Sequence, residues 1–447
     1  MAKYLGMLAA VLLAGGASSC DPSLRVVHPR NLPAGAIVPC GEAYLGTPLE
    51  FIAGGKYLVV GDRFAPYGVD VETGVPARGP SGRIVAVSPT GLVVFDETYS
   101  VETERRRPPS RQMGLWDFSD RPPRLVRRWS AGPNDWRCIF SEDGKHLAFQ
   151  KAEQVWLCDA ADGSSTRQVM ESWSSPLAFS PDGNILACLI TLPESQRSGI
   201  ALRNLAEERL LHTLDPGAGR EQAGLGPVVF SADGAALVVR HSYFPPGPQW
   251  HAIRTVPETV VYDVTGGTEL LRISGDAKVT GERRFLIDAL EEPDPAGAGL
   301  VVYDLSTGRE ARRLRAGWPG ALARDTSLYA ARRGAAASTE DRMSKIGLWD
   351  LATGTQVRSL PAVKDWWECT ALSPTGRLVV LSTVCRMRVA DCITGRVVLE
   401  VYKPPRGETG VYIGSLAAFS PDGKHLAFNV NSQAFVANLE AIRPAGG

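Results

Sequence analysis

Histidine is the side chain through which this sequence would most readily bind a metal or transfer a proton near neutral pH. The chain has six histidines: His28, His146, His212, His241, His251 and His425. No two of them have metal-ligand spacing, and an H-E-x-x-H helix motif is absent. A G-x-S-x-G nucleophile elbow and a Walker A loop are absent as well. We therefore expect no catalytic residue, no metal and no cofactor.

Two of these histidines stand in nearly the same phrase. Residues 140–149 read FSEDGKHLAF and residues 419–428 read FSPDGKHLAF, so only Glu142 and Pro421 differ. Either one site needs both copies, or a structural unit is used repeatedly. The rest of the chain favours the second explanation, because the phrase recurs in weaker form.

Nine segments share the plan of a short apolar run, a turn and a second apolar run. They begin at Phe51, Val85, Cys138, Ala178, Val229, Lys278, Ala321, Ala371 and Ala418. Their spacing of roughly 35 to 55 residues is typical of propellers and other repeat folds. In the Ser-Pro-Asp-Gly turn, Pro sets φ, Asp accepts a local backbone hydrogen bond and Gly takes a positive φ. The phrase therefore predicts a β-hairpin.

Each unit has a second half that predicts another strand, a turn and a last strand, such as LVVYDLSTGREARRL from Leu300. Each unit thus has four short strands, and four-stranded antiparallel sheets repeated in this way form a β-propeller. The hairpin strands are apolar at nearly every position. This pattern indicates strands buried on both faces.

The second halves carry a resemblance to a known family. IGLWDLATGTQVRSL from Ile346, together with FSPDGKHLAF, resembles the bacterial WD40 repeat. The Trp-Asp pair is literal at Trp116-Asp117 and Trp349-Asp350, whereas the Gly-His pair that opens a WD40 repeat is missing. The resemblance implies an all-β interaction fold held by packing. A TolB-like propeller is the second choice.

The fold class that follows is a single all-β propeller of eight or nine four-stranded blades. The chain ends after a third strand, and the segment SLRVV from Ser23 could provide the fourth. That pairing would close the ring by joining the N- and C-terminal strands and would leave no open sheet edge. The sixth unit, from Lys278, matches the pattern least.

The N-terminus predicts export. Residues 1–19 have a basic residue, an apolar run and small residues, as a signal peptide does. Ala17 to Cys20 resemble a lipobox, so we expect lipid attachment at Cys20, with cleavage to a soluble exported protein as the alternative. Residues 20–40 then form an anchor linker and possible closing strand, and residues 41–447 form the propeller. Removal of Cys20 leaves seven cysteines, so at least one thiol is free.

The composition limits the partners. Lys plus Arg and Asp plus Glu each number 48, so the net charge of the 447-residue chain is zero and a nucleic-acid partner is not expected. We expect a monomer.

Inserted loops are the strongest functional signal. They follow the predicted second strands, at residues 96–112, 240–258, 291–299 and 332–344. In an antiparallel blade these loops share one face with the loops that lead into the first strands. The candidate partner-binding residues on that face are Trp136, Trp173, Trp318, Trp366, Trp367, Arg105, Arg106 and Arg107. Tryptophan is enriched at interaction hot spots, although the rings could also pack between blades.

The sequence therefore predicts a non-catalytic protein-interaction scaffold at the bacterial cell envelope, anchored in the membrane through Cys20. The alternative is an envelope enzyme or a glycan-binding propeller with a site in the central channel. A purely structural envelope protein is the third possibility.

Overall fold

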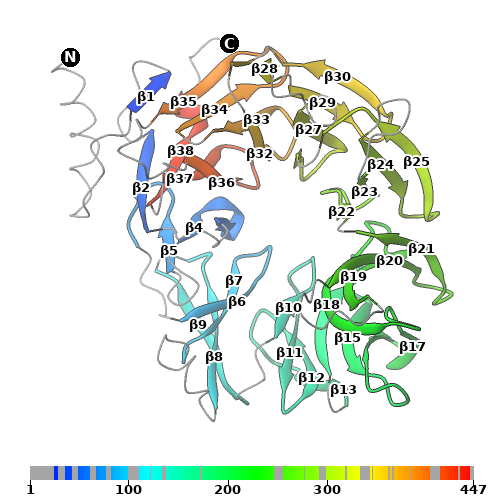
Figure 1. The fold of residues 1–447 in the computed structure, drawn as a ribbon. Helices are drawn as coiled ribbons and strands as arrows, with labels where there is room; N and C mark the ends of the chain where they lie inside the picture. The colour runs from blue at the N-terminus through cyan, green and yellow to red at the C-terminus, as the bar shows by residue number, and fades with distance from the viewer. Residues whose placement is uncertain are drawn as a thin grey trace. The chain divides into compact units, whose positions relative to one another are not determined.

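The structure is a computed structural model. It describes residues 25–28, 36–42, 49–60, 67–76, 82–98, 110–120, 122–132, 137–171, 174–245, 255–275, 277–290, 299–317, 320–332, 343–344, 346–360, 363–364, 367–383, 385–402, 413–430 and 433–442. The fold is all-β, and nine antiparallel sheets follow one another as the blades of a β-propeller (Figure 1). The predicted fold class is confirmed, with nine blades. In the described part of the chain, no helix is long and apolar enough to cross a membrane.

The chain forms two compact units. One of them holds blades 2 to 6, in residues 82–289 and 301–312. Blade 2 is β6 (Arg83–Val87), β7 (Leu92–Asp96), β8 (Arg111–Asp117) and β9 (Arg124–Ala131). Blade 3 is β10 (Cys138–Phe140), β11 (His146–Lys151), β12 (Gln154–Asp159) and β13 (Arg167–Met170). Blade 4 is β14 (Ser175–Phe179), β15 (Ile185–Thr191), β16 (Ser198–Asn204) and β17 (Arg209–Leu214). Blade 5 is β18 (Glu221–Phe230), β19 (Ala236–Phe244), β20 (Val256–Asp263) and β21 (Glu269–Ser274). Blade 6 is β22 (Lys278–Val279), β23 (Phe285–Ala289), β24 (Leu300–Asp304) and β25 (Arg309–Leu314).

The other unit holds blades 1, 7, 8 and 9. Blade 1 is β3 (Glu50–Ile52), β4 (Tyr57–Val60) and β5 (Tyr67–Asp70), with a short 3-10 turn, η1 (Ala53–Gly55), and a bridge from Val69 to Pro76. Blade 7 is β26 (Ala321–Leu322), β27 (Leu328–Arg332), β29 (Ile346–Asp350) and β30 (Thr355–Ser359), and β28 (Met343–Ser344) pairs separately with β31 (Val363–Lys364). Blade 8 is β32 (Glu368–Leu372), β33 (Leu378–Ser382), β34 (Arg386–Asp391) and β35 (Val397–Tyr402). Blade 9 is β36 (Ile413–Phe419), β37 (His425–Val430) and β38 (Gln433–Asn438), followed by the short helix α3 (Leu439–Ile442).

The last blade is completed by the N-terminal part of the chain, although not by the predicted segment. The strand β2 (Ile37–Glu42) pairs with β38, with Ile37 opposite Ala437, and so provides the fourth strand (Figure 1). The predicted segment forms β1 (Arg25–His28), which instead adds a fifth strand to blade 8 beside β35. The principle of joining the ends is confirmed, whereas the assignment of the closing strand to SLRVV is wrong.

The repeated phrase forms the predicted hairpin between the first and second strands. In blade 3 the Ser141 hydroxyl donates to Asp143 Oδ1 at 2.7 Å and accepts the His146 backbone N–H at 2.9 Å. Gly144 has φ +70° in this turn. Ser420, Asp422, His425 and Gly423 repeat these contacts in blade 9. His146 and His425 thus take part through their backbone, as members of a copied hairpin.

The core lies between blades rather than within one of them. Each second strand has at least three consecutive buried residues, and β7 and β33 are buried along their whole length. Between blades 2 and 3, for example, Val94 and Leu115 pack in one cluster with Leu147 and Phe149. A sheet that is covered on both faces needs apolar residues at successive positions, which explains why the hairpin strands lack polar alternation.

The cysteines belong to this apolar packing. The seven described cysteines are all free thiols. Cys138 and Cys188 are buried, and burial raises the pKa of both thiols above the ordinary range. Both act as small apolar residues of the core, whereas Cys369 is half-buried.

Two hairpin glycines provide a test of how adjacent blades constrain each other. A Cβ at Gly144 would lie 2.6 Å from Thr90 Cγ2 in blade 2, whereas a Cβ at Gly183 would meet nothing within 4 Å. Both residues have a φ near +70°. We expect Gly183→Ala to lower the free energy of unfolding by about 1 kcal/mol through the backbone alone. Gly144→Ala should lower it by about 1 to 3 kcal/mol more, because the neighbouring blade must shift. Urea unfolding would measure both, and equal losses would contradict an interblade contact at this turn.

Candidate functional site

The insertions follow the second strands, as predicted. The described strands that flank them are β7 and β8 in blade 2, β19 and β20 in blade 5, β23 and β24 in blade 6, and β27 and β29 in blade 7. Because the strands of a blade are antiparallel, these loops emerge at the edge of the blade opposite the Ser-Asp hairpins. Most of the residues within the insertions lie outside the described part of the chain.

Most of the predicted contact residues also lie outside the described residues: Cys20, Arg105, Arg106, Arg107, Trp136, Trp173, Trp318 and Trp366. Trp367 is described, and it is only 1% exposed. It packs with Leu348 and Leu381, and the Arg388 guanidinium lies 5.0 Å from its ring centroid. Trp367 therefore has the packing role that the alternative interpretation gave to these rings, and it presents no free ring to a partner.

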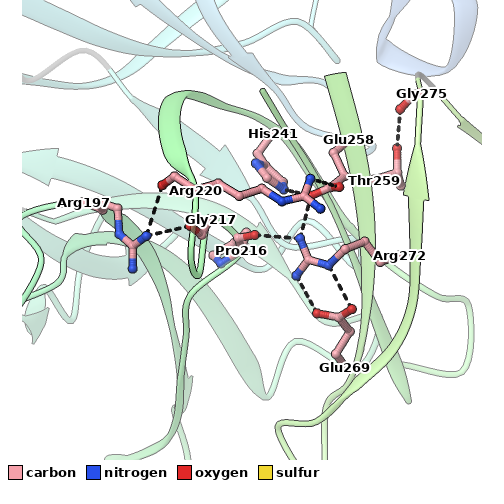
Figure 2. A network of polar contacts seen from close by, with 10 residues as sticks. All are labelled: Arg197, Pro216, Gly217, Arg220, His241, Glu258, Thr259, Glu269, Arg272 and Gly275. Atoms are coloured by element: carbon pink, nitrogen blue, oxygen red, sulfur yellow. Dashed lines mark hydrogen bonds and ion pairs between the residues drawn. The ribbon is translucent and has the colours of Figure 1, made fainter. Parts of the chain in front are cut away.

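A buried carboxylate organises the loop edge of blade 5. Glu258, on β20, is 2% exposed, and its carboxylate is in contact with two arginines and one histidine (Figure 2). Arg272 Nη1 donates to its Oε2 at 2.5 Å, and Arg220 Nη1 donates to its Oε1. His241 Nε2 lies 2.9 Å from Oε2. The carboxylate thus joins β19, β20, β21 and the residue that precedes β18.

His241 is a neutral member of this network. Burial lowers the pKa of its imidazole, and Arg272 and Arg220 lower it further, against the opposing effect of Glu258. In the neutral ring Nε2–H donates to Glu258, so Nδ1 is an acceptor. Nδ1 is buried and has no hydrogen-bond partner among the described residues.

The network extends to the adjacent blade through arginine–carbonyl contacts. Arg272 Nη1 donates to Pro216 O at 3.0 Å, and its other atoms form an ion pair with Glu269. Arg197 Nη1 donates to Gly217 O at 2.6 Å and to Arg220 O at 3.2 Å (Figure 2). The segment between blades 4 and 5 is thus held on the same side as the base of the insertion at residues 240–258.

Blade 2 has a related arrangement at the base of its own insertion. The Asp96 side chain is fully buried at the end of β7 and forms an ion pair with Arg111 at the start of β8. Next to it, Trp116 Nε1 donates to Glu97 Oε1 at 2.8 Å and Arg128 Nε donates to Glu97 Oε2 at 2.8 Å. Two insertions therefore begin and end at strands that buried or half-buried carboxylates hold together.

Sequence reasoning missed these carboxylates. Glu258 lies beside the buried stretch Thr259–Tyr262 of β20, and an acid next to such a stretch is the signal that could have identified it. Such an arrangement fixes strand ends, because each acid is already engaged by guanidinium groups. Among the described residues, no group of three or more histidine, cysteine or acidic side chains could hold a metal ion.

Comparison with known proteins shows the fold alone. No protein-family model matches the chain, and no curated protein sequence matches it. The structure is similar to Porphyromonas gingivalis dipeptidyl peptidase 4, with a TM-score of 0.53 and 11% identity over 87% of this chain and 65% of that chain. It is also similar to Kuenenia stuttgartiensis hydrazine synthase, with a TM-score of 0.43 and 13% identity over 84% and 98% of the two chains. At these identities neither likeness assigns an activity.

Loss of the Glu258 carboxylate should lower the free energy of unfolding much more than loss of the Glu269 carboxylate. In Glu258→Gln the amide Nε2 would face a guanidinium, and the two arginines would lose their shared counter-charge. We expect the free energy of unfolding to fall by about 3 kcal/mol. Glu269→Gln is the matched control. Its side chain is 40% exposed, so its loss should be below about 1 kcal/mol. Chemical unfolding of both variants would measure the difference, and similar losses would contradict a central role for Glu258.

The neutral state of His241 predicts a pH dependence. Its pKa is lowered in the folded protein, whereas in the unfolded chain it is near 6.5. As the pH falls below about 6.5, the unfolded chain therefore binds more protons at this position, and the free energy of unfolding decreases. His241→Gln keeps a donor toward Glu258 but does not titrate, so its stability should depend less on pH. Urea unfolding at pH 7.5 and 5.5 would test this, and equal pH dependence in both proteins would contradict it.

Proposed function

We propose that the protein is a non-catalytic interaction scaffold of the bacterial cell envelope, built on a WD40-type propeller and held at the membrane by a lipidated Cys20. It binds a protein partner as a monomer, through the inserted loops and the loops that lead into the first strands. The WD40-like repeats, the lipobox-like segment and the placement of the insertions at one edge of the blades support this proposal.

The observation that carries the proposal is the buried Glu258 network. Blade 5 has the longest strands of the described part of the chain, and they continue to the base of the insertion at residues 240–258. A recognition loop binds well when its ends are held on a rigid scaffold, because less entropy is lost on binding. The contacts of Glu258 with Arg220, Arg272 and His241 hold the strands at the base of this loop in fixed positions. Asp96 and Arg111 serve the insertion of blade 2 in the same way.

The predicted surface changes in one respect. Trp136, Trp173, Trp318 and Trp366 stay in the proposed contact set, together with Arg105, Arg106 and Arg107. Trp367 is removed from it because its ring is buried in the core of blades 7 and 8. The main rival remains an envelope enzyme or a glycan-binding propeller, since a propeller fold does not determine function.

An affinity capture from envelope extract tests the proposal. Three baits of residues 21–447 are compared: the unchanged chain, a chain with residues 246–254 replaced by a short Gly-Ser linker, and a control with Val357→Ser and Ile393→Ser. The control removes two exposed apolar side chains that lie outside the insertions. We expect one saturable protein partner on the unchanged and control baits and at least about a tenfold loss on the loop replacement.

Thermal unfolding would first show that all three baits are folded. Equal capture by all three would contradict the role of the blade 5 insertion. Saturable binding of a glycan or turnover of a substrate, without a protein partner, would favour the rival function.

A further inference from the structure

A cavity lies beside the first strands of three consecutive blades in the unit that holds blades 2 to 6. It offers about 240 Å³ of free space. Its walls are mostly apolar and come from β10 and from the C-terminal parts of β14 and β18, including Ile139, Leu177 and Val229. These three side chains are partly exposed, whereas the neighbouring Phe179 and Phe230 are buried. A wall of this kind suits a hydrocarbon group.

One ion pair is the charged feature of the cavity lining. Arg283, from the hairpin of blade 6, donates Nη2–H to Glu142 Oε2 at 2.8 Å and Nη1–H to Glu142 Oε1. Glu142 belongs to the hairpin of blade 3, so the pair joins two blades between which blades 4 and 5 lie in the chain. Both residues line the cavity.

Both residues also stand at hairpin positions where most of the other copies have a different residue. Glu142 stands where the otherwise matching phrase of blade 9 has Pro421. Arg283 stands where most of the other hairpins have glycine, the exception being Thr326 in blade 7. The Arg283 N–H donates to Thr280 O at 2.8 Å, as the Gly234 N–H donates to Ser231 O. Arg283 even keeps a left-handed φ of +51°, which a side chain makes unfavourable. The ion pair therefore joins residues from two hairpins, and the arginine keeps its place against backbone strain.

We propose that this cavity binds a small apolar monocarboxylate, with its carboxylate on Arg283 and its hydrocarbon chain against Ile139, Leu177 and Val229. The ligand carboxylate replaces Glu142, which occupies the guanidinium in the bidentate manner that a carboxylate ligand would adopt. This site is separate from the proposed protein-binding loops, and its test does not depend on them.

The exchange is energetically reasonable because one carboxylate replaces another. The side chains of Arg283 and Glu142 are 27% and 41% exposed, and ion pairs of this exposure contribute little net stability. Affinity then comes from burial of the hydrocarbon chain, which increases with the apolar area removed from water. A space of 240 Å³ corresponds to about eight water molecules, so a medium-chain acid fits better than a drug-sized ligand.

Isothermal titration of the chain from residue 21 to 447 with sodium octanoate tests the proposal. Octanol, which lacks the carboxylate, and acetate, which lacks the chain, should each bind at least about tenfold more weakly. Arg283→Gly introduces the residue that most of the other hairpins have at this position and relieves the backbone strain, so it should fold. It should weaken octanoate binding by about tenfold or more.

Glu142→Gln is the decisive variant, because it should strengthen octanoate binding, whereas Arg283→Gly should weaken it. Without the internal competitor, octanoate should bind about threefold more tightly. Arg284→Gln is the charge-matched control, since Arg284 is exposed and lies outside the cavity lining, and its affinity should equal that of the unchanged protein. A purely structural ion pair would give no opposite effects.

Three outcomes would overturn the proposal. They are octanol binding as tightly as octanoate, Arg283→Gly keeping full affinity, and a short peptide with an apolar C-terminal residue binding in clear preference to octanoate. The last result would assign the cavity to peptide C-termini instead.

Discussion

The burial of both faces of every second strand is the constraint on which the rest of this structure depends. Because the blades within each unit pack against one another through these strands, the core is a series of layers between sheets, as the cluster of Val94 and Leu147 shows. A polar group on such a strand cannot reach water and must find a partner within the protein. Asp96, His241 and Glu258 accordingly lie toward the insertion side of their strands, beside the stretch of buried apolar residues, and pair with each other or with arginines.

The two edges of a blade consequently have different roles. One edge carries the Ser-Asp hairpins, whose internal hydrogen bonds leave little room for change. Arg283 is unusual in this shared geometry, because it keeps a left-handed φ where most of the hairpins have glycine. The opposite edge carries the insertions, and there the strand ends are held by carboxylate–guanidinium contacts rather than by turn geometry. Variation at this edge is compatible with the fold because the apolar layers do not extend into it.

Local sequence patterns were sufficient to predict the blade. The Ser-x-Asp-Gly turn specifies its own hydrogen bonds within six residues, so the hairpins, the nine units and the buried strands followed from the sequence. Pairings between distant segments could not be predicted in this way. The segments that form β1 and β2 are both short and apolar, and nothing local states which of them meets β38. Likewise, Glu258 lies 38 positions from Arg220 in the chain. The only sign of their contact in the sequence is an acidic residue beside a buried strand segment, which does not identify its partners.

The pairing of β2 with β38 has a consequence for how the chain acquires its structure. Ribosomes release the N-terminal segment first, yet β2 can complete blade 9 only after the last strand has been made, because Ile37 lies opposite Ala437. Contacts of such high sequence separation slow folding, since a very long loop must close before they form. Blades 2 to 6 contain mostly local pairings and can be expected to assemble earlier, during synthesis. The edge of β2 that pairs with β38 thus stays unpaired until β38 has been made, and during this interval the exposed edge favours aggregation.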